Sequence, residues 1–369
     1  MSEETTYSKG LKGVIACETA VSLLDTEQEK IIIRGQDLIE LSQKKTYADI
    51  VHLLLEGELP TPEARDATEK RLTSEGKLPE NIIDILKLLP EHTHAMDGQR
   101  TAISILGGYD DKIADRSTAV NKERAYKLMG QLPSITVNSY RVLNGQESIT
   151  PDKSLSYSAN FLYMITGEKP TELQEKIFDQ ALLLYSEHEM PNSTFTARVI
   201  ASTNSDMYGA LAGAVASLKG NLHGGANEAV MEMLHEAETV DGFEKLLKNK
   251  LENKEKVMGF GHRVYMDRMD PRALEMKKAL TELSELTGDT KLLDMCQKGE
   301  DVIKQAKGLY PNLDYYAAPV FWKLGIPIAL YTPIFFSSRV AGLCAHIIEQ
   351  HDNNYLFRPR VKYTGAPLA

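Results

Sequence analysis

The chain has 369 residues and a formal net charge of −10, and 42% of its residues are hydrophobic and 25% charged. This composition is ordinary for a globular protein, and the length is more than one hydrophobic core usually fills, so two or three domains are expected. No long cluster of Lys and Arg stands out, and no apolar run approaches the roughly 18 residues of a membrane span, so neither a nucleic acid nor a membrane is expected as a partner.

The N-terminus and the cysteines favour a cytoplasmic location. The first ten residues, MSEETTYSKG, contain no basic segment followed by an apolar stretch, so no secretory signal is expected. Cys17, Cys296 and Cys344 are odd in number and scattered, and they match neither a disulfide framework nor a zinc-binding spacing.

A short β-hairpin is expected near the start of the chain. The apolar runs AVSLLD (20–25) and KIIIRG (30–35) flank a polar TEQE turn, which is typical of two antiparallel strands. Helical periodicity dominates afterwards. The segment TYADIVHLLLEGELP (46–60) predicts a helix closed by Gly57 and Pro60.

Apolar residues at three- and four-residue steps predict two more helices, one ending at Pro90 and one within 171–189. The Ala- and Gly-rich segment DMYGALAGAVASLKG (206–220) predicts a helix that packs closely against other helices. The sequence therefore indicates a mostly α-helical protein with a minor β-hairpin.

Four polar segments interrupt the helical pattern within the last 150 residues. They are 220–227, 259–272, YPNLDYY (310–316) and YTPIFFSSR (331–339). Polar loops that place Gly beside His and Arg are where functional sites are usually built.

Three of the nine histidines differ in context from the rest. His188 ends a predicted helix, and His223 and His262 lie beside glycines that leave the imidazole uncovered and allow close approach of a ligand. The others have ordinary core, boundary, loop or helix-start contexts: His52, His92, His94, His235, His346 and His351.

Arginines and one aspartate complete the set of candidates. Arg272 follows Pro271 at a probable helix start, Arg339 follows a Ser pair, and Arg358 flanks Pro359. A guanidinium group binds carboxylates bidentately, although most arginines are simply solvated. Asp314, among aromatic and aliphatic neighbours, fits two roles equally well, a helix cap or a partly desolvated base with a raised pKa.

Metal and phosphate sites are less well supported. The sequence has no HExxH motif and no pair of histidines four residues apart. The glycine-rich segments match neither the Walker A motif nor GxGxxG. No metal and no cofactor are expected.

Taken together, these segments resemble the citrate synthase family, and their order and spacing match over nearly the whole chain. The matching segments are GLKGVIA, RGQDLIELS, SEHEMPNSTFTARV, LKGNLHGGANEAVM, KEKVMGFGHRVY, DPRA, PNLDYYAAPV, YTPIFFSSRVAGLCAHIIEQ and RPRVKYTG. The segment HTHAMDGQRTAIS departs from the family pattern by placing Ala95 where proline is usual. The chain is most similar to the short 2-methylcitrate synthase/citrate synthase type, which lacks an extra regulatory N-terminal domain.

The resemblance implies catalytic roles for three residues. Asp314 would remove a proton from the α-carbon of an acyl-CoA thioester. His223 would hydrogen-bond the thioester oxygen as negative charge develops there, and His262 would polarise the keto group of oxaloacetate.

The resemblance also implies binding residues. His188, Arg272, Arg339 and Arg358 would hold oxaloacetate and the product carboxylates. The CoA adenine would lie against the backbone of Lys256, Val257, Met258, Gly259 and Phe260. Acyl-CoA is a substrate, so the resemblance implies no cofactor.

The implied fold is all-α and has two domains. Residues 1–224 and 326–369 would form a large helical domain and residues 225–325 a small one, with the active site in the cleft between them. The family forms homodimers with shared active sites. The helix 206–218 would lie at the interface, and Arg358 would reach the neighbouring subunit.

Three other functions compete with an acyl-CoA condensation that accepts propionyl-CoA and acetyl-CoA. A strict citrate synthase would use acetyl-CoA only, a difference of one methylene. A citrate-cleaving lyase usually carries ATP-using domains, for which 369 residues leave no room. A catalytically inactive helical binding protein would not need His223, His262 and Asp314. An assay of thiol release from acetyl-CoA and oxaloacetate separates a synthase from the lyase and from the binding protein. The ratio of kcat/KM for acetyl-CoA and propionyl-CoA distinguishes the two synthases.

Overall fold

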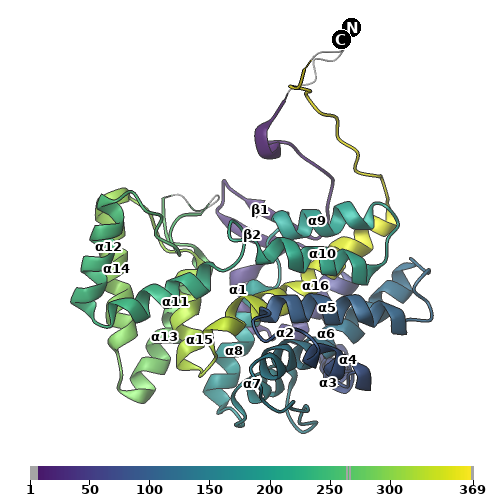
Figure 1. Ribbon diagram of the computed structural model, residues 1–369, viewed down its shortest axis with the longest axis horizontal. Helices are drawn as coiled ribbons and strands as arrows, with labels where there is room; N and C mark the ends of the chain where they lie inside the picture. The colour runs from purple at the N-terminus through teal and green to yellow at the C-terminus, as the bar shows by residue number, and fades with distance from the viewer. Residues whose placement is uncertain (1–6, 263–264, 266, 367–369) are drawn as a thin grey trace.

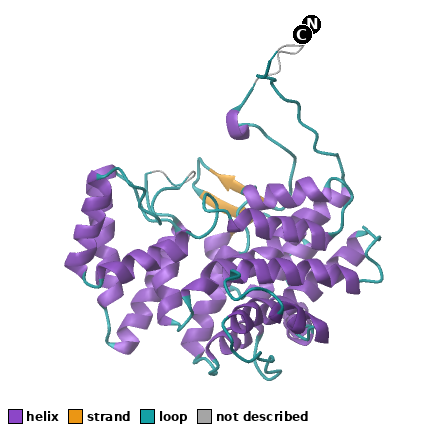
Figure 2. Ribbon diagram, viewed as in Figure 1, coloured by secondary structure: helices purple, strands orange, loops and turns teal. Residues whose placement is uncertain are grey.

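The computed structural model describes residues 7–262, 265 and 267–366. Within these residues the chain forms sixteen α-helices, three short 3-10 helices and one small antiparallel sheet (Figure 2). The expected all-α fold with a minor N-terminal hairpin is confirmed. The elements are η1 Lys9–Leu11, β1 Ser22–Asp25, β2 Lys30–Ile33, β3 Gln36–Asp37, α1 Leu38–Lys44, α2 Tyr47–Glu56, α3 Pro62–Ser74, α4 Glu80–Lys87, α5 Ala95–Leu106, η2 Gly107–Tyr109, α6 Thr118–Leu143, α7 Tyr157–Thr166, α8 Glu172–Tyr185, α9 Asn192–Ala201, α10 Met207–Lys219, α11 Ala226–Ala237, α12 Val240–Glu252, α13 Pro271–Thr287, α14 Lys291–Lys307, α15 Leu313–Lys323, η3 Ile328–Leu330 and α16 Tyr331–Asp352.

The predicted hairpin consists of β1 and β2, which pair antiparallel from Ser22↔Ile33 to Asp25↔Lys30. A third strand, β3, adds two residues to the other edge of β2. The sequence did not indicate β3, because two residues are too few to show an alternating pattern. Asp37 at its end caps α1 by accepting hydrogen bonds from two backbone N–H groups.

Capping residues explain where the predicted helices begin and end. Thr46 and Asp49 form a reciprocal capping box at the start of α2, and Gly57 ends this helix in the left-handed conformation with φ = 93°. Thr171 and Gln174 form the same capping box at the start of α8. The helices expected at 46–57, before Pro90 and within 171–189 are therefore confirmed as α2, α4 and α8.

Helix α16 runs through the centre of the molecule and contacts α2, α5, α6, α8, α9 and α10 (Figure 1). A stretch of 25 residues that includes it, Ile328–Asp352, is long and apolar enough by composition to cross a membrane, but 83% of the apolar window is buried inside the protein. Its apolar character is therefore explained by its place in the core. Helices α11 to α15 gather to one side of this core in Figure 1.

The Ala- and Gly-rich segment forms α10, which lies between α5 and α9. Gly213 faces Ile200 of α9 so closely that a Cβ atom would collide with the isoleucine side chain. The small residues therefore allow close helix packing, as the sequence predicted.

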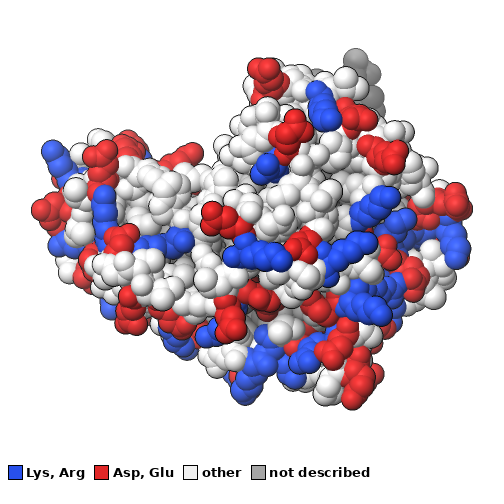
Figure 3. All heavy atoms as spheres, turned by 90° about the horizontal axis from the view of Figure 1, so that it is seen from below, with Lys and Arg blue, Asp and Glu red and all other residues white. Residues whose placement is uncertain are grey.

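The N-terminal segment, which contains η1, and the C-terminal segment both leave the helical body on the same side (Figure 1). Apolar side chains along them remain in solvent, for example Ile15 with 90% of its surface exposed and Val361 with 89%. On the face shown in Figure 3, by contrast, basic and acidic side chains are interspersed over the helical body.

The three cysteines are free thiols. Cys296 and Cys344 are buried, and Cys17 is half-buried in the N-terminal segment. Burial raises the pKa of all three thiols above the usual value.

Gly342 lets α16 approach the end of α8. A Cβ atom at this position would collide with Glu187 Oε2 and lie 2.7 Å from the carbonyl oxygen of Ser186. The Glu187 side chain cannot swing away easily, because its Oε1 accepts a hydrogen bond from Ser22 and lies 3.3 Å from His346 Nε2. The glycine therefore fixes the position of the segment that leads into His188.

We expect Gly342→Ala to destabilise the protein by about 1–3 kcal/mol, the usual effect of overpacking a filled core. Chemical denaturation monitored by circular dichroism measures this change. Gly108→Ala is the matched control, because a Cβ there meets no atom within 4 Å. Equal stability of the two variants would contradict the packing argument.

Candidate active site

Six of the candidate residues, from five separate parts of the chain, converge. Asp314, in the first turn of α15, is electrostatically coupled to Arg272 at the start of α13 and to Arg339 in α16. The rings of His188, just after α8, and His262, in the loop before α13, meet edge to face with centroids 5.1 Å apart. Residues 263, 264 and 266 of the predicted loop 259–272 lie outside the described residues.

Arg272 is held by its own helix cap. Asp270 precedes α13 and accepts hydrogen bonds from Arg272 Nε at 3.2 Å and from Nη2 at 2.8 Å. Both side chains are buried. Asp270 also accepts a hydrogen bond from the backbone N–H of Leu313 at 3.3 Å, which ties the start of α15 to the start of α13. Within the described residues, Arg272 Nη1 makes no hydrogen bond and is left for a ligand.

Arg339 is buried in the middle of α16. Its Nε donates to the main-chain oxygen of Tyr185 at 2.6 Å, and its guanidinium carbon lies 4.8 Å from the centroid of the Phe335 ring. Nη1 and Nη2 pair with no side chain or backbone group in the described part of the chain. Burial, together with the charge of Arg272, lowers the pKa of Arg339 to about 10.

These two arginines form a desolvated, positively charged centre. A carboxylate that contacts the guanidinium groups of Arg272 and Arg339 would replace the water molecules that burial has removed. It would form charge-assisted hydrogen bonds with them. The Nη atoms of these two arginines that have no partner among the described residues can therefore bind carboxylate groups of a ligand.

The three candidate histidines are neutral at pH 7. Burial is the main cause that lowers the pKa of His223 to about 4 and that of His262 to about 4, and nearby arginines add to the effect. Burial, Arg272 and Arg339 hold the pKa of His188 well below its usual range. Among the described residues, the buried Nε2 of His188 has no hydrogen-bond partner, so a ligand could satisfy it.

Contacts with Ser193 fix the tautomer of His223. The Ser193 backbone N–H donates to His223 Nε2 at 3.1 Å, and Ser193 Oγ lies 2.9 Å from the same nitrogen. Because Nε2 accepts, the proton of the neutral ring lies on Nδ1. His223 can therefore act as a hydrogen-bond donor through Nδ1.

The cap of α15 is Asn312, not Asp314. Asn312 Oδ1 accepts a hydrogen bond from the backbone N–H of Asp314 at 3.2 Å, which leaves the Asp314 carboxylate free of a capping role. Asp314 Oδ1 accepts a hydrogen bond from the Tyr185 hydroxyl at 2.7 Å. Burial raises the pKa of Asp314, while Tyr185 and the two arginines oppose that rise. Of the two roles that the sequence left open, the helix cap is therefore excluded.

The segment expected to bind CoA lies beside this aspartate. Gly259 O accepts a hydrogen bond from the Asn312 backbone N–H at 2.9 Å, and the ring of Phe260 packs on Tyr315 with centroids 4.4 Å apart. Gly259 has φ = 85° and no room for a side chain against Tyr315. Lys256 is exposed, and Val257 and Met258 are partly exposed.

Arg358 is the one candidate that the structure does not bring to this centre. It is exposed in the extended C-terminal segment that leaves the body (Figure 1). A role for Arg358 in its own subunit's site is not supported by this position.

Sequence reasoning missed four residues that shape the site. They are Asp270, Tyr185, Glu187 and Ser193. Asp270 could have been found from the Asp-Pro pair that opens α13, a common helix-start signal. Tyr185 looked like any apolar residue of α8, and nothing local distinguished it.

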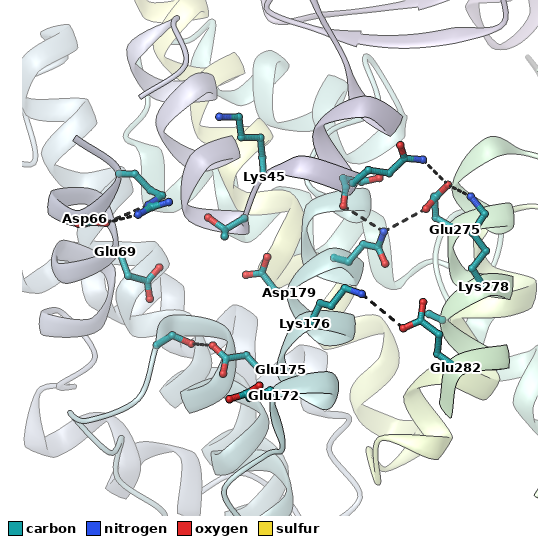
Figure 4. A pocket seen from close by; sticks show the side chains of 17 residues that line it. Lys45, Asp66, Glu69, Glu172, Glu175, Lys176, Asp179, Glu275, Lys278 and Glu282 are labelled. Carbon is teal, nitrogen blue, oxygen red and sulfur yellow. Dashed lines mark hydrogen bonds and ion pairs between the residues drawn. The ribbon is translucent and has the colours of Figure 1, made fainter. Parts of the chain in front are cut away.

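A separate pocket of about 580 Å³ lies among α1, α3, α8 and α13 (Figure 4). Most of its lining side chains are charged, including Glu69, Asp179 and Glu275. None of the candidate site residues lines it, so it is distinct from the centre described above. Among the described residues, no group of His, Cys, Asp and Glu side chains is arranged to hold a metal ion.

Comparison with known proteins gives consistent results. The sequence profile described as "Citrate synthase, C-terminal domain" matches residues 10–360. The chain is 63% identical over 365 residues to the citrate/2-methylcitrate synthase of Bacillus subtilis (strain 168), which covers 99% of this chain and 98% of that protein. It is 62% identical over 360 residues to the citrate synthase of Heyndrickxia coagulans, which covers 98% and 96%. The citrate synthase of Thermoplasma acidophilum, solved as a ternary complex with carboxymethyl coenzyme A and oxaloacetate, superposes with a TM-score of 0.92 at 32% identity, covering 99% of this chain and 97% of that one.

We expect His223 and His262 to stay neutral as the pH falls from 8 to 5.5, because the pKa of each is lowered to about 4. NMR of protein labelled in its histidine rings measures this directly. The variants His223→Gln and His262→Gln assign the two signals. A titration midpoint near the ordinary value of 6.5 for either ring would contradict the burial argument.

Proposed function

Because the chain belongs to the citrate synthase family, we propose that it joins the α-carbon of an acyl-CoA thioester to the keto carbon of oxaloacetate. The acyl donor is propionyl-CoA or acetyl-CoA, and the products are 2-methylcitrate or citrate and free CoA. One observation carries the proposal: a carboxylate, Asp314, stands at a buried centre that combines two guanidinium groups with neutral imidazoles. No cofactor is needed, because acyl-CoA is itself a substrate.

Asp314 acts as the base. Its carboxylate takes a proton from the α-carbon of the thioester, and the electron pair left behind moves toward the thioester oxygen. The Nδ1–H of His223 donates a hydrogen bond to that oxygen and stabilises the charge that develops there. A raised pKa favours this role, because it makes Asp314 a stronger base than an exposed carboxylate.

Oxaloacetate binds through its carboxylates to Arg272 and Arg339, whose free guanidinium edges are otherwise without partners among the described residues. His188 Nε2 supplies a further buried hydrogen-bonding group. His262 hydrogen-bonds the keto oxygen and polarises the keto carbon, which the α-carbon of the acyl group then attacks. Water finally cleaves the thioester bond of the condensed intermediate and releases CoA as a thiol.

CoA lies along Lys256 to Phe260, with its adenine against the backbone of this stretch. The position of this stretch supports the proposal, because the carbonyl oxygen of Gly259 accepts a hydrogen bond from the backbone N–H of Asn312, two residues before Asp314. A thioester extending from this segment would reach Asp314.

Two domains close over these substrates. We assign residues 1–224 and 326–369 to the large domain and residues 225–325 to the small one. An ion pair between Glu29 in the hairpin turn and Arg268 in the loop before α13 joins the two parts. Closure of this kind would exclude water until condensation is complete.

The enzyme works in the cytoplasm as a homodimer with shared active sites. The exposed apolar residues of the extended terminal segments support this proposal, because a second copy would cover them. Helix α10 lies at the interface, and Arg358 in the C-terminal segment enters the partner's cleft.

A strict citrate synthase remains the second candidate, since the name of the Heyndrickxia coagulans relative mentions citrate alone. The acyl groups differ by one methylene, which contributes about 1–3 kcal/mol to discrimination. The ratio of kcat/KM for acetyl-CoA and propionyl-CoA decides between the two candidates.

We expect the wild-type protein to release CoA thiol from either acyl-CoA only when oxaloacetate is present. Asp314→Asn should lose this activity by at least about 100-fold, since a carboxamide keeps the shape but cannot take the proton. Calorimetry should show nearly unchanged oxaloacetate binding in the variant. Turnover close to that of the wild type in Asp314→Asn would refute the assignment of the base.

The shared site predicts complementation between two inactive variants, Arg358→Ala and Asp314→Asn, refolded together. One site of a mixed dimer would carry both substitutions and the other would carry none. Random pairing makes about half of the dimers mixed, so about a quarter of wild-type activity should return. If Arg358 serves its own subunit, each site keeps one lesion. Activity no higher than that of the separately refolded variants, with mixed dimers confirmed by mass, would then rule out sharing.

A further inference from the structure

We propose that Tyr185 is the positioning residue of the catalytic base. Its hydroxyl holds the Asp314 carboxylate and its main-chain oxygen holds Arg339, so one residue sets the distance between the base and an anchor for oxaloacetate. The inference rests on the condensation proposed above and adds to it a residue that touches neither substrate.

Two hydrogen bonds of Tyr185 are short and involve groups that the proposed function uses. The hydroxyl donates to Asp314 Oδ1 at 2.7 Å, and the carbonyl oxygen accepts from Arg339 Nε at 2.6 Å. Asp314 lies on α15 and Arg339 on α16, whereas Tyr185 is the last residue of α8. A single residue therefore joins three helices at the site.

The hydroxyl can only act as a donor toward this carboxylate. Burial and the charge of Asp314 raise the pKa of Tyr185 well above its usual value, so the phenol keeps its proton. With Oδ1 occupied, Oδ2 accepts no hydrogen bond from any other described residue. The proton from the substrate is therefore directed to Oδ2.

The ring of Tyr185 is rigidly packed. It is buried, and it lies 4.7 Å from the centroid of Phe335 and 6.2 Å from that of Phe321. Phe335 in turn lies against the guanidinium group of Arg339. Because the ring is fixed, its hydroxyl stays in one place and favours a single orientation of the Asp314 carboxylate, which is what positioning requires.

The hydrogen bond also tunes the acidity of the base. Burial raises the pKa of Asp314, and donation from Tyr185 is the strongest of the effects that lower it. The other charged groups around this carboxylate are Arg272 and Asp270 from the start of α13 and Arg339 from α16, and the three neutral histidines lie near them. Removing the hydroxyl leaves all of these in place.

The test is Tyr185→Phe, assayed for kcat and KM over a range of pH with acetyl-CoA and oxaloacetate. We expect kcat to fall about 10- to 100-fold, because the base is less well oriented, while KM for oxaloacetate changes by less than about threefold. The acidic limb of the kcat profile should move to higher pH, because the base has lost the donor that lowers its pKa.

Tyr157→Phe is the matched control. Tyr157 is buried in α7, and its hydroxyl donates to the main-chain oxygen of Met129 at 2.9 Å, so the substitution removes a comparable hydrogen bond outside the site. Its kcat and pH profile should match those of the wild type. The wild-type assay tests the proposed condensation, whereas the comparison of Tyr185→Phe with the wild type tests the role of Tyr185. Failure of one proposal can therefore be distinguished from failure of the other.

A second probe covers the case in which Tyr185→Phe does not fold. Site-specific 3-fluorotyrosine at position 185 keeps the shape of the ring but makes the hydroxyl a stronger donor, so the acidic limb should move to lower pH. An unmoved limb in the fluorotyrosine enzyme overturns the proposal. So does a Tyr185→Phe enzyme whose kcat falls while its limb stays at the wild-type pH, since that result indicates a purely structural role.

Discussion

Two guanidinium groups are held out of water at the centre of this fold, and the surrounding structure is arranged to make that possible. Removing a charge from solvent is costly unless partners replace the lost hydration. Asp270 supplies that partner for Arg272, and for Arg339 a carbonyl oxygen, an aromatic ring and the charge of Glu187 share the task. Burial, with the charges of these arginines added to it, lowers the pKa of His188 and His262, so the same buried environment that holds the guanidinium groups keeps these imidazoles neutral.

Helix α16 links the buried charge of Arg339 to the packing of the helices around it. It carries Arg339, and three residues further on Gly342 allows the end of α8 to come close. The carboxylate of Glu187 then joins the hairpin, through Ser22, to His346 on α16. Segments far apart in the sequence are thus fixed around one helix, which explains why so long an apolar helix lies in the interior.

The sequence predicted the local structure well, but it predicted contacts between residues far apart in the chain less well. The hairpin, α8 and the start of α13 at Pro271 follow from strand alternation, capping residues and proline, which act within a few residues. Asp314 could not be distinguished from a helix cap until Asn312 was seen to occupy that position. Tyr185 and Ser193 went unnoticed because their roles depend on partners 129 and 30 residues away, and no local pattern encodes such pairings.

The burial of the cysteines has a consequence for an enzyme whose product is a thiol. Free CoA would form a mixed disulfide with any accessible thiolate of the protein once an oxidant is present, and such exchange requires a deprotonated, reachable sulfur. Cys296 and Cys344 are enclosed in the core, and burial raises the pKa of Cys17 in the N-terminal segment. Burial of this kind disfavours mixed-disulfide formation between these thiols and the CoA that the reaction releases.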